Sequence, residues 1–217
     1  MRYKFPESIQ IFEKFYQEYD NWFIRNKWVY RSEIEAIRKL IPKHGLGLDV
    51  GVGTGRFSFP FGIKIGIDPS KMMGLIAKKR GINIFCGVGE QLPFRKEIFD
   101  FVLIVTTICF VKEPLITLKE IKRILKIGGS IIIGLIDKNS ELGKLYESKK
   151  DESKFYRIAK FYSAERMKKW LNRLSFSDLT IYQTIFHNLN EINTVEPIKE
   201  GYGKGGFLVF KGKKQKK

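Results

Sequence analysis

The spacing of apolar residues near the start of the chain predicts helices. Apolar side chains recur there at steps of three and four, which is typical of one buried helix face. These steps run through Ile9, Phe12, Tyr16 and Tyr19, and again through Ile34, Ile37 and Ile41. We therefore expect two helices between about residues 6 and 40, the second of which ends before Pro42 and Gly45.

Beyond Gly45 the pattern changes to short apolar runs that alternate with helical stretches. The expected strands are residues 47–50, 63–67, 82–86, 99–105 and 130–136, followed by two late strands at 180–186 and 207–210. The expected helices are residues 70–80, 113–126 and 163–174. The run at 99–105 is nearly continuous, which is typical of a strand buried on both faces. Such alternation predicts an α/β fold, a doubly wound and mostly parallel sheet with helices on both faces.

A glycine-rich segment follows the first expected strand. It reads Leu48-Asp-Val-Gly-Val-Gly-Thr-Gly-Arg56, with glycines at positions 51, 53 and 55. Glycines let a backbone turn sharply and approach a ligand closely, and open α/β sheets bind ligands at this end of their strands. A dinucleotide fingerprint would need glycine where Arg56 stands, and the chain has no phosphate-binding P-loop pattern.

An acidic residue ends the second expected strand. Asp68 stands before Pro69, which stiffens the turn, and lies 17 residues after Gly51. An ionised carboxylate accepts two hydrogen bonds, so it suits the two neighbouring hydroxyls of a ribose. We expect a nucleoside-containing ligand at this edge of the sheet.

Five segments in this order resemble class I S-adenosylmethionine-dependent methyltransferases of the small type 11 group. They are Leu48-Asp-Val-Gly-Val-Gly-Thr-Gly-Arg-Phe57, Gly66-Ile-Asp-Pro-Ser70, Gly87-Val-Gly-Glu-Gln-Leu-Pro-Phe94, Ile98-Phe-Asp-Phe-Val102 and Glu120-Ile-Lys-Arg-Ile-Leu-Lys-Ile-Gly-Gly129. The resemblance covers roughly residues 45 to 137. It implies a Rossmann-like sheet of seven strands in which the last strand lies antiparallel between strands five and six. It also implies S-adenosylmethionine as cofactor, with S-adenosylhomocysteine as product.

The same resemblance implies roles for individual residues. The methionine and ribose would face Gly51, Gly53 and Gly55, and Asp49 would support their loop and the amino group. The ribose would be held by Asp68 and Pro69, and the adenine would lie near Val88, Gly89 and Glu90. Thr106 would form the floor near the sulfonium, and Tyr19 would belong to a lid. Many relatives have an acidic residue where Val88 stands. Adenine recognition here should therefore rest on backbone contacts and apolar packing.

Several of these residues have a purely structural alternative. Asp49 is equally well explained as a loop-capping residue, and Glu90 as a solvated loop charge. The aromatic residues around Tyr19 either pack on the sheet or cover the cofactor. Asp100 is interpreted as structural.

Three further residues have reactive side chains but no expected catalytic role. His44 and His187 are lone histidines without a visible partner. Cys109 is not proposed as a nucleophile, because it lacks the preceding proline of the cytosine C5-methylating enzymes.

Composition changes this picture little. Among 217 residues there are two cysteines and a net charge of +17, with five lysines in the last seven residues. Basic charge can indicate a nucleic-acid partner, but abundant charge also suits proteins from heat-adapted organisms, so nucleic acid is only weakly favoured. The chain opens without a secretion signal and has no membrane-length apolar run. We expect a cytoplasmic protein with no membrane association; its oligomeric state cannot be read.

These observations together predict an enzyme built as one domain, residues 1–217. We expect a helical lid at 1–44, a cofactor-binding core at 45–137, an acceptor-side excursion and the last strands at 138–210, and a disordered basic tail at 211–217. The expected reaction is direct displacement of the methyl group onto a small-molecule acceptor. A nitrogen or already acidic acceptor is mildly favoured, with nitrogen preferred, since no general base is evident. We expect no metal site. The alternatives are methylation of RNA or protein and a non-catalytic RNA-associated protein.

Overall fold

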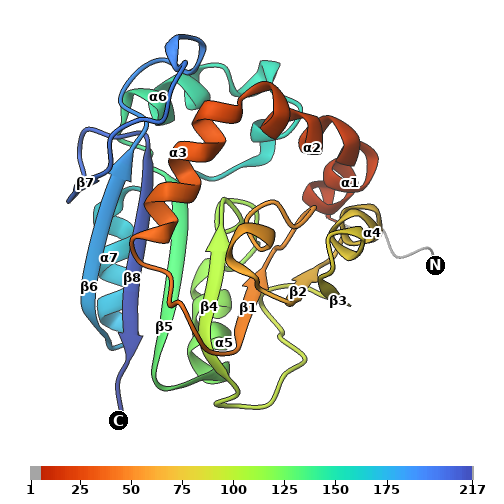
Figure 1. Cartoon of the computed structure of the whole chain (residues 1–217), viewed down its shortest axis with the longest axis vertical. Coiled ribbons are helices and arrows are strands. Elements are labelled where there is room, and N and C mark those ends of the chain that lie inside the picture. The colour runs from red at the N-terminus through yellow and green to blue at the C-terminus, as the bar shows by residue number, and fades with distance from the viewer. Residues whose placement is uncertain (1–5, 217) are drawn as a thin grey trace.

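One mixed sheet with helices on both faces forms the protein. The computed structural model describes residues 6–216. The helices are α1 (Glu7–Lys14), α2 (Tyr16–Arg25), α3 (Lys27–Arg38), α4 (Lys71–Lys79), α5 (Pro114–Ile124), α6 (Glu141–Ser148) and α7 (Ala164–Arg173). The strands are β1 (Gly47–Val50), β2 (Ile65–Asp68), β3 (Asn83–Cys86), β4 (Phe99–Val105), β5 (Leu125–Ile136), β6 (Phe176–Thr184), β7 (Lys199–Glu200) and β8 (Phe207–Lys214). Figure 1 shows their arrangement.

The strand order is β3-β2-β1-β4-β5-β8-β6-β7. Strands β1 to β5 pair in parallel, whereas β8 lies antiparallel between β5 and β6. This confirms the inserted last strand that the resemblance implied. The described chain has eight strands rather than seven, because the two-residue β7 adds an edge beside β6. No described helix is long and apolar enough to cross a membrane.

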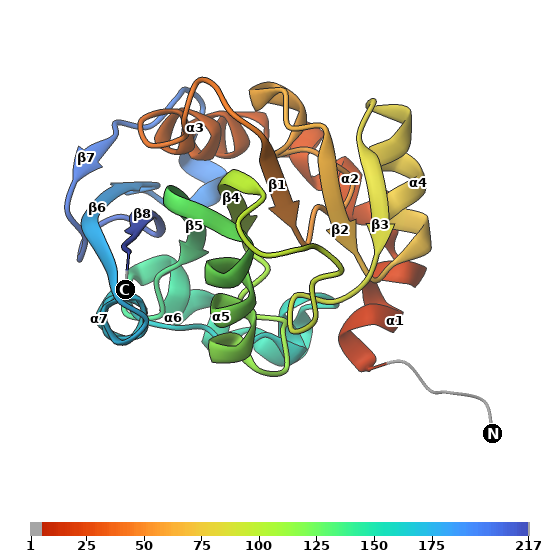
Figure 2. The ribbon, with the colours of Figure 1, turned by 90° about the horizontal axis from the view of Figure 1, so that it is seen from below.

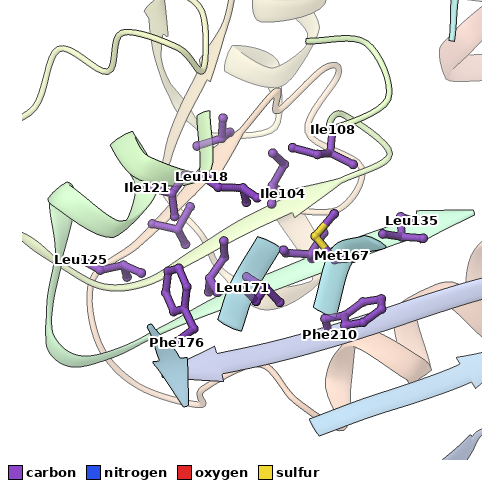
Figure 3. Packing of buried hydrophobic residues seen from close by; sticks show 14 of the residues in the cluster. Ile104, Ile108, Leu118, Ile121, Leu125, Leu135, Met167, Leu171, Phe176 and Phe210 are labelled. Carbon is purple, nitrogen blue, oxygen red and sulfur yellow. The ribbon is translucent and has the colours of Figure 1, made fainter. Parts of the chain in front are cut away.

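The apolar run of β4 is buried on both faces of the sheet, as predicted. Val102 and Ile104 pack toward α5 and α7, while Leu103 and Val105 pack toward α3. Figure 2 shows α3 on one face and α5 and α7 on the other. In Figure 3, Leu118 and Ile121 of α5 and Met167 and Leu171 of α7 meet Ile104 and Phe210. Period-two alternation thus separates two apolar layers, which fix the strand ends that form the site.

The N-terminal region contains three helices, not the expected two. Breaks at Phe15 and Asn26 separate α1, α2 and α3. The amide of the Asn26 side chain donates to the carbonyl of Trp22, and such a local bond competes with helix continuation. The breaks allow the short α1 and α2 to bend over the end of the sheet (Figure 1).

Two further boundaries differ from the prediction. Helix α5 ends at Ile124, and β5 begins directly at Leu125, because Leu125 already pairs with Phe99 of β4. The expected disordered tail at 211–217 is wrong for residues 211–214, which form the second half of β8. Lys214 is nearly buried there, and its ammonium group donates to the carbonyl of Leu125 at 2.7 Å. Residues 1–5 of the expected lid and Lys217 of the expected tail lie outside the described residues.

Candidate active site

The glycine-rich loop connects β1 to a single 3₁₀ turn, Phe59–Phe61, at the carboxyl end of the sheet. The amide of Gly51 donates to the carbonyl of Ile67 at 2.8 Å, which anchors the loop to β2. Gly51 has a φ of +71°, and a Cβ atom there would collide with the side chain of Thr107. Glycine is therefore required at this position for both conformation and space.

Asp68 ties β2 to this loop. Its Oδ2 accepts a hydrogen bond from the amide of Gly53 at 2.8 Å, and its Oδ1 accepts one from the amide of Ser70 at 2.8 Å. The carboxylate is 9% exposed and faces a cavity, to which Gly51, Gly53 and Pro69 also contribute. Burial raises the pKa of Asp68 to about 6, although both backbone hydrogen bonds oppose that rise. Each oxygen keeps acceptor capacity for a ligand hydroxyl.

The loop after β4 forms the floor of the cavity. Thr106 has a φ of +48°, unusual for a β-branched residue, and its amide donates to the carbonyl of Gly134 at 2.8 Å. The hydroxyl of Thr107 donates toward the carbonyl of Gly51 at 3.2 Å. Strained backbone held in this way is common where a site must be shaped.

The loop after β3 supplies a third wall, formed by Gly87, Val88, Gly89 and Glu90. A Cβ at Gly89 would lie 2.8 Å from Cγ2 of Thr117, so the backbone approaches α5 closely. Glu90 accepts hydrogen bonds from the amides of Lys112 and Glu113 at 2.8 and 3.2 Å. Glu90 therefore lines the cavity and also braces the start of α5, rather than being only a solvated charge.

Two residues expected at the cofactor lie beneath the loop instead. Asp49 is 2% exposed, and its Oδ2 accepts a hydrogen bond from the hydroxyl of Ser58 at 2.5 Å. Burial raises the pKa of Asp49 to about 7, against the effect of the Ser58 bond. A Cβ at Gly55 would meet the side chains of Ile82 and Ala77, because this glycine packs against α4. Both residues support the loop from below, as the structural alternative for Asp49 expected.

Aromatic residues of α1 and α2 cover the cavity. Phe12 stacks on Phe155 with ring centroids 5.4 Å apart and meets Phe110 edge-on at 4.9 Å. Tyr19 contacts Phe155 at 6.0 Å. The N-terminal helices and the segment between β5 and α7 thus meet above the carboxyl ends of β1 and β4 (Figure 1). The cavity volume is about 1020 Å³, ample for a cofactor and a small acceptor together.

A partly buried ion-pair network anchors the roof. Oδ2 of Asp20 in α2 forms two ion pairs, with Nη2 of Arg56 from the glycine-rich loop at 2.8 Å and with Nη2 of Arg80 from the end of α4 at 2.9 Å. Burial alone would raise the pKa of Asp20, but hydrogen bonds from both arginines outweigh it and lower the pKa to about 2. In the sequence, Arg56 was notable only because it stands where a dinucleotide-binding fingerprint would need glycine. Its role as an anchor depends on a residue 36 positions away.

The side chains of Cys109, Asp100 and His187 take structural positions. Burial raises the pKa of Cys109 to about 12, so its thiol stays protonated. Asp100 caps the start of β1 by accepting from the amide of Leu46, and it pairs with Lys126. His187 was expected to be unpaired, yet its Nδ1 lies 2.9 Å from a carboxylate oxygen of Glu196.

Glu33 is a cavity residue that sequence reasoning missed. It lies on α3, is 7% exposed, and burial raises its pKa to about 8. The available signal was its spacing, because Val29 and Ile37, four residues away on either side, form the buried face of the same helix. The described residues include no cluster of histidine, cysteine and carboxylate groups able to hold a metal ion.

Comparisons with known proteins agree with this geometry. A family model of the methyltransferase domain matches residues 48–133. An uncharacterized protein from Methanocaldococcus jannaschii is 50% identical over 206 residues, covering 95% of this chain and all of the relative. A Bacillus licheniformis demethylmenaquinone methyltransferase is 31% identical over 137 residues, covering 56% of this chain and 59% of that enzyme.

A solved structure extends the similarity to the whole fold. It is a SAM-dependent methyltransferase from Thermotoga maritima, described as a possible histamine N-methyltransferase. It is 45% identical with a TM-score of 0.93, covering 96% of this chain and 100% of that one. The loop, Asp68 and the roofed cavity of this chain fit the cofactor of such enzymes, because a ribose acceptor, a close-approaching backbone and apolar walls converge there. The chain therefore belongs to the class I S-adenosylmethionine-dependent methyltransferases.

Proposed function

We propose that this methyltransferase acts on a small organic molecule and transfers the methyl group to nitrogen. The observation that carries the proposal is the single cavity that runs from Asp68 and the glycine-rich loop to the aromatic residues under α1 and α2. A roof closed by Phe12, Tyr19 and Phe155 leaves room for a small acceptor and excludes water.

The cofactor takes one end of this cavity in the proposal. Asp68, with Pro69 beside it, accepts from the ribose hydroxyls, while the backbone at Gly51 and Gly53 lies along the methionine portion. Val88 and Gly89 flank the adenine, with Glu90 holding their loop to α5. Tyr19 and Thr106 close the site around the sulfonium from above and below, and Asp49 and Gly55 act only through the loop.

Methyl transfer from a sulfonium is a direct displacement, so alignment in a dry site is the main requirement. The neighbouring phenols are poor bases at neutral pH, because burial first and nearby carboxylates second raise the pKa of Tyr19 and of Tyr146. A nitrogen acceptor that arrives without its proton needs no strong base. The name of the Thermotoga maritima protein, a possible histamine N-methyltransferase, supports the same choice of acceptor atom.

The proposal is tested by methyl transfer from isotopically labelled S-adenosylmethionine. The purified protein is incubated with the cofactor and separate pools of small amines (histamine among them), small phenols, quinols, bulk RNA and a peptide mixture. We expect labelled methyl groups on a small amine, together with S-adenosylhomocysteine. Label confined to RNA or peptide would replace the small-molecule assignment, and label on oxygen or carbon alone would contradict the nitrogen assignment.

A further inference from the structure

A carboxylate without a partner faces the acceptor end of the cavity. Glu33 projects from α3 on the same face as the buried Val29 and Ile37. It lines the cavity together with Trp22, Leu142 and Tyr146. Apolar and aromatic groups thus surround an acidic side chain that is 7% exposed.

The carboxylate of Glu33 receives no hydrogen bond or ion pair from residues 6–216. Burial is the one cause that raises its pKa, to about 8, so no neighbouring cation offsets the desolvation. The phenols of Tyr19, Tyr30, Tyr146 and Tyr156 lie near enough to Glu33 to interact with it electrostatically, and burial raises the pKa of each. A buried carboxylate without a hydrogen-bond or ion-pair partner destabilises the folded protein. A ligand that pairs with the carboxylate would offset that unfavourable free energy.

The surroundings of Glu33 select the charge of such a ligand. An anion would be repelled, and a neutral apolar molecule would leave the carboxylate unpaired. A cation can pair with the carboxylate and also lie against the ring faces of the aromatic residues. Tyr146 and Tyr156 stack with ring centroids 4.5 Å apart, so flat aromatic surface is available in the same cavity.

We propose that Glu33 is the residue that recognises the acceptor, by pairing with a protonated nitrogen of a small amine inside the aromatic part of the cavity, while a second, unprotonated nitrogen of the same molecule receives the methyl group. The proposal rests on the proposed function and adds the class of substrate, an organic cation, to it. Because burial keeps the pKa of Glu33 above neutral pH, pairing with a cation releases the Glu33 proton to solvent. The affinity for an amine therefore rises as pH increases from 6 toward 8.

The test uses three amines and their neutral alcohol counterparts, bound to the protein saturated with S-adenosylhomocysteine. The pairs are tyramine and tyrosol, 2-phenylethylamine and 2-phenylethanol, and tryptamine and tryptophol. Calorimetry compares the wild type with Glu33→Gln, which keeps the shape of the side chain but cannot ionise. The matched control is Glu35→Gln on the same helix, where an exposed side chain pairs with Arg38.

For the wild type we expect at least one amine to bind at least about 10-fold more tightly than its alcohol, as loss of a buried charge pair implies. That preference, and its rise with pH, should disappear in Glu33→Gln and persist in Glu35→Gln. Absence of any amine preference in the wild type, or its survival in Glu33→Gln, overturns the proposal. Binding of S-adenosylhomocysteine distinguishes a failure of the Glu33 proposal from a failure of the proposed function. A wild type that does not bind S-adenosylhomocysteine would count against the proposed function itself.

Discussion

Among the described residues, burial raises the pKa values of four buried carboxyl groups, those of Asp49, Asp68, Glu33 and Asp137, and the first three of these lie in or next to the site. The Asp49 carboxylate accepts a hydrogen bond from the hydroxyl of Ser58 under the loop. The Asp68 carboxylate accepts hydrogen bonds from two backbone amides. Glu33 has no such partner among the described residues. The first two are therefore positioned by the protein, whereas the third is left for a ligand.

Glu33 should make the stability of the empty protein depend on pH. Its pKa is about 8 when folded and 4.5 in the reference state, so the folded state holds the proton more tightly. The stability that Glu33 contributes is complete below about pH 4.5 and is lost as pH rises toward 8. We expect Glu33→Gln to be more stable than the wild type at pH 8, by an amount of the order of a few kcal/mol, and nearly equal at pH 4.5.

Urea unfolding at several pH values between 4.5 and 8 measures this difference. Glu35→Gln, on the exposed side of the same helix, should follow the wild type throughout. Parallel curves for the wild type and Glu33→Gln would show that burial does not hold the Glu33 proton.

At the residue scale, the sequence led to Asp68 more readily than to Glu33. Asp68 ends an apolar strand beside a glycine-rich loop, so its position at the sheet edge follows from local pattern. Glu33 stands among Arg31, Ser32 and Glu35 and looks like a surface residue. Its burial depends on where α3 meets the segment after β5, which no local pattern encodes.

At the element scale, ion pairs hold α2 to the glycine-rich loop. Asp20 links α2 to Arg56 and Arg80, and the hydroxyl of Tyr30 donates to the carbonyl of Arg56 at 2.6 Å. The roof is therefore attached to the same loop that carries Gly51 and Gly53. Arg56 thus connects the helices of the roof directly to the glycine-rich loop.

Replacing Asp20 should loosen that attachment. In Asp20→Asn two partly buried arginines lose their charged partner, which should cost about 1–3 kcal/mol of stability and speed the dissociation of S-adenosylhomocysteine. Thermal unfolding and stopped-flow displacement measure the two effects. Glu141→Gln, which breaks an exposed ion pair with Lys144, should change neither. Unchanged dissociation in Asp20→Asn would mean that α2 does not retain the cofactor.

The elements could be predicted where their pattern is local. Strand β4 and the start of α4 at Ser70 follow the prediction, and the Ser70 hydroxyl accepts from the amide of Met73 as an N-cap should. The end of α5 and the length of β8 could not be predicted. Both are set by pairing with distant strands, since Leu125 joins Phe99 and the lysines of β8 pair with β5 and β6.

At the scale of the whole molecule, two segments far apart in sequence complete one cavity. The sheet with its loops supplies the floor, and α1 and α2 meet the segment between β5 and α7 above it. The strand pattern alone predicted a doubly wound sheet, and the inserted antiparallel strand came from family resemblance. A helical lid was expected from the sequence, but the contact of Phe12 with Phe155 could not be predicted, because it joins residues 143 positions apart.

Titration with S-adenosylhomocysteine tests the central claim most directly. The comparison uses the wild type, Asp68→Asn and Asp100→Asn, an aspartate at the opposite end of the sheet that pairs with Lys126, with NAD as the control ligand. We expect micromolar binding to the wild type and to Asp100→Asn, binding weakened by about 1.5–3 kcal/mol in Asp68→Asn, and none with NAD. A folded wild type that fails to bind S-adenosylhomocysteine, or an Asp68→Asn variant that binds it as tightly as the wild type, would contradict the account.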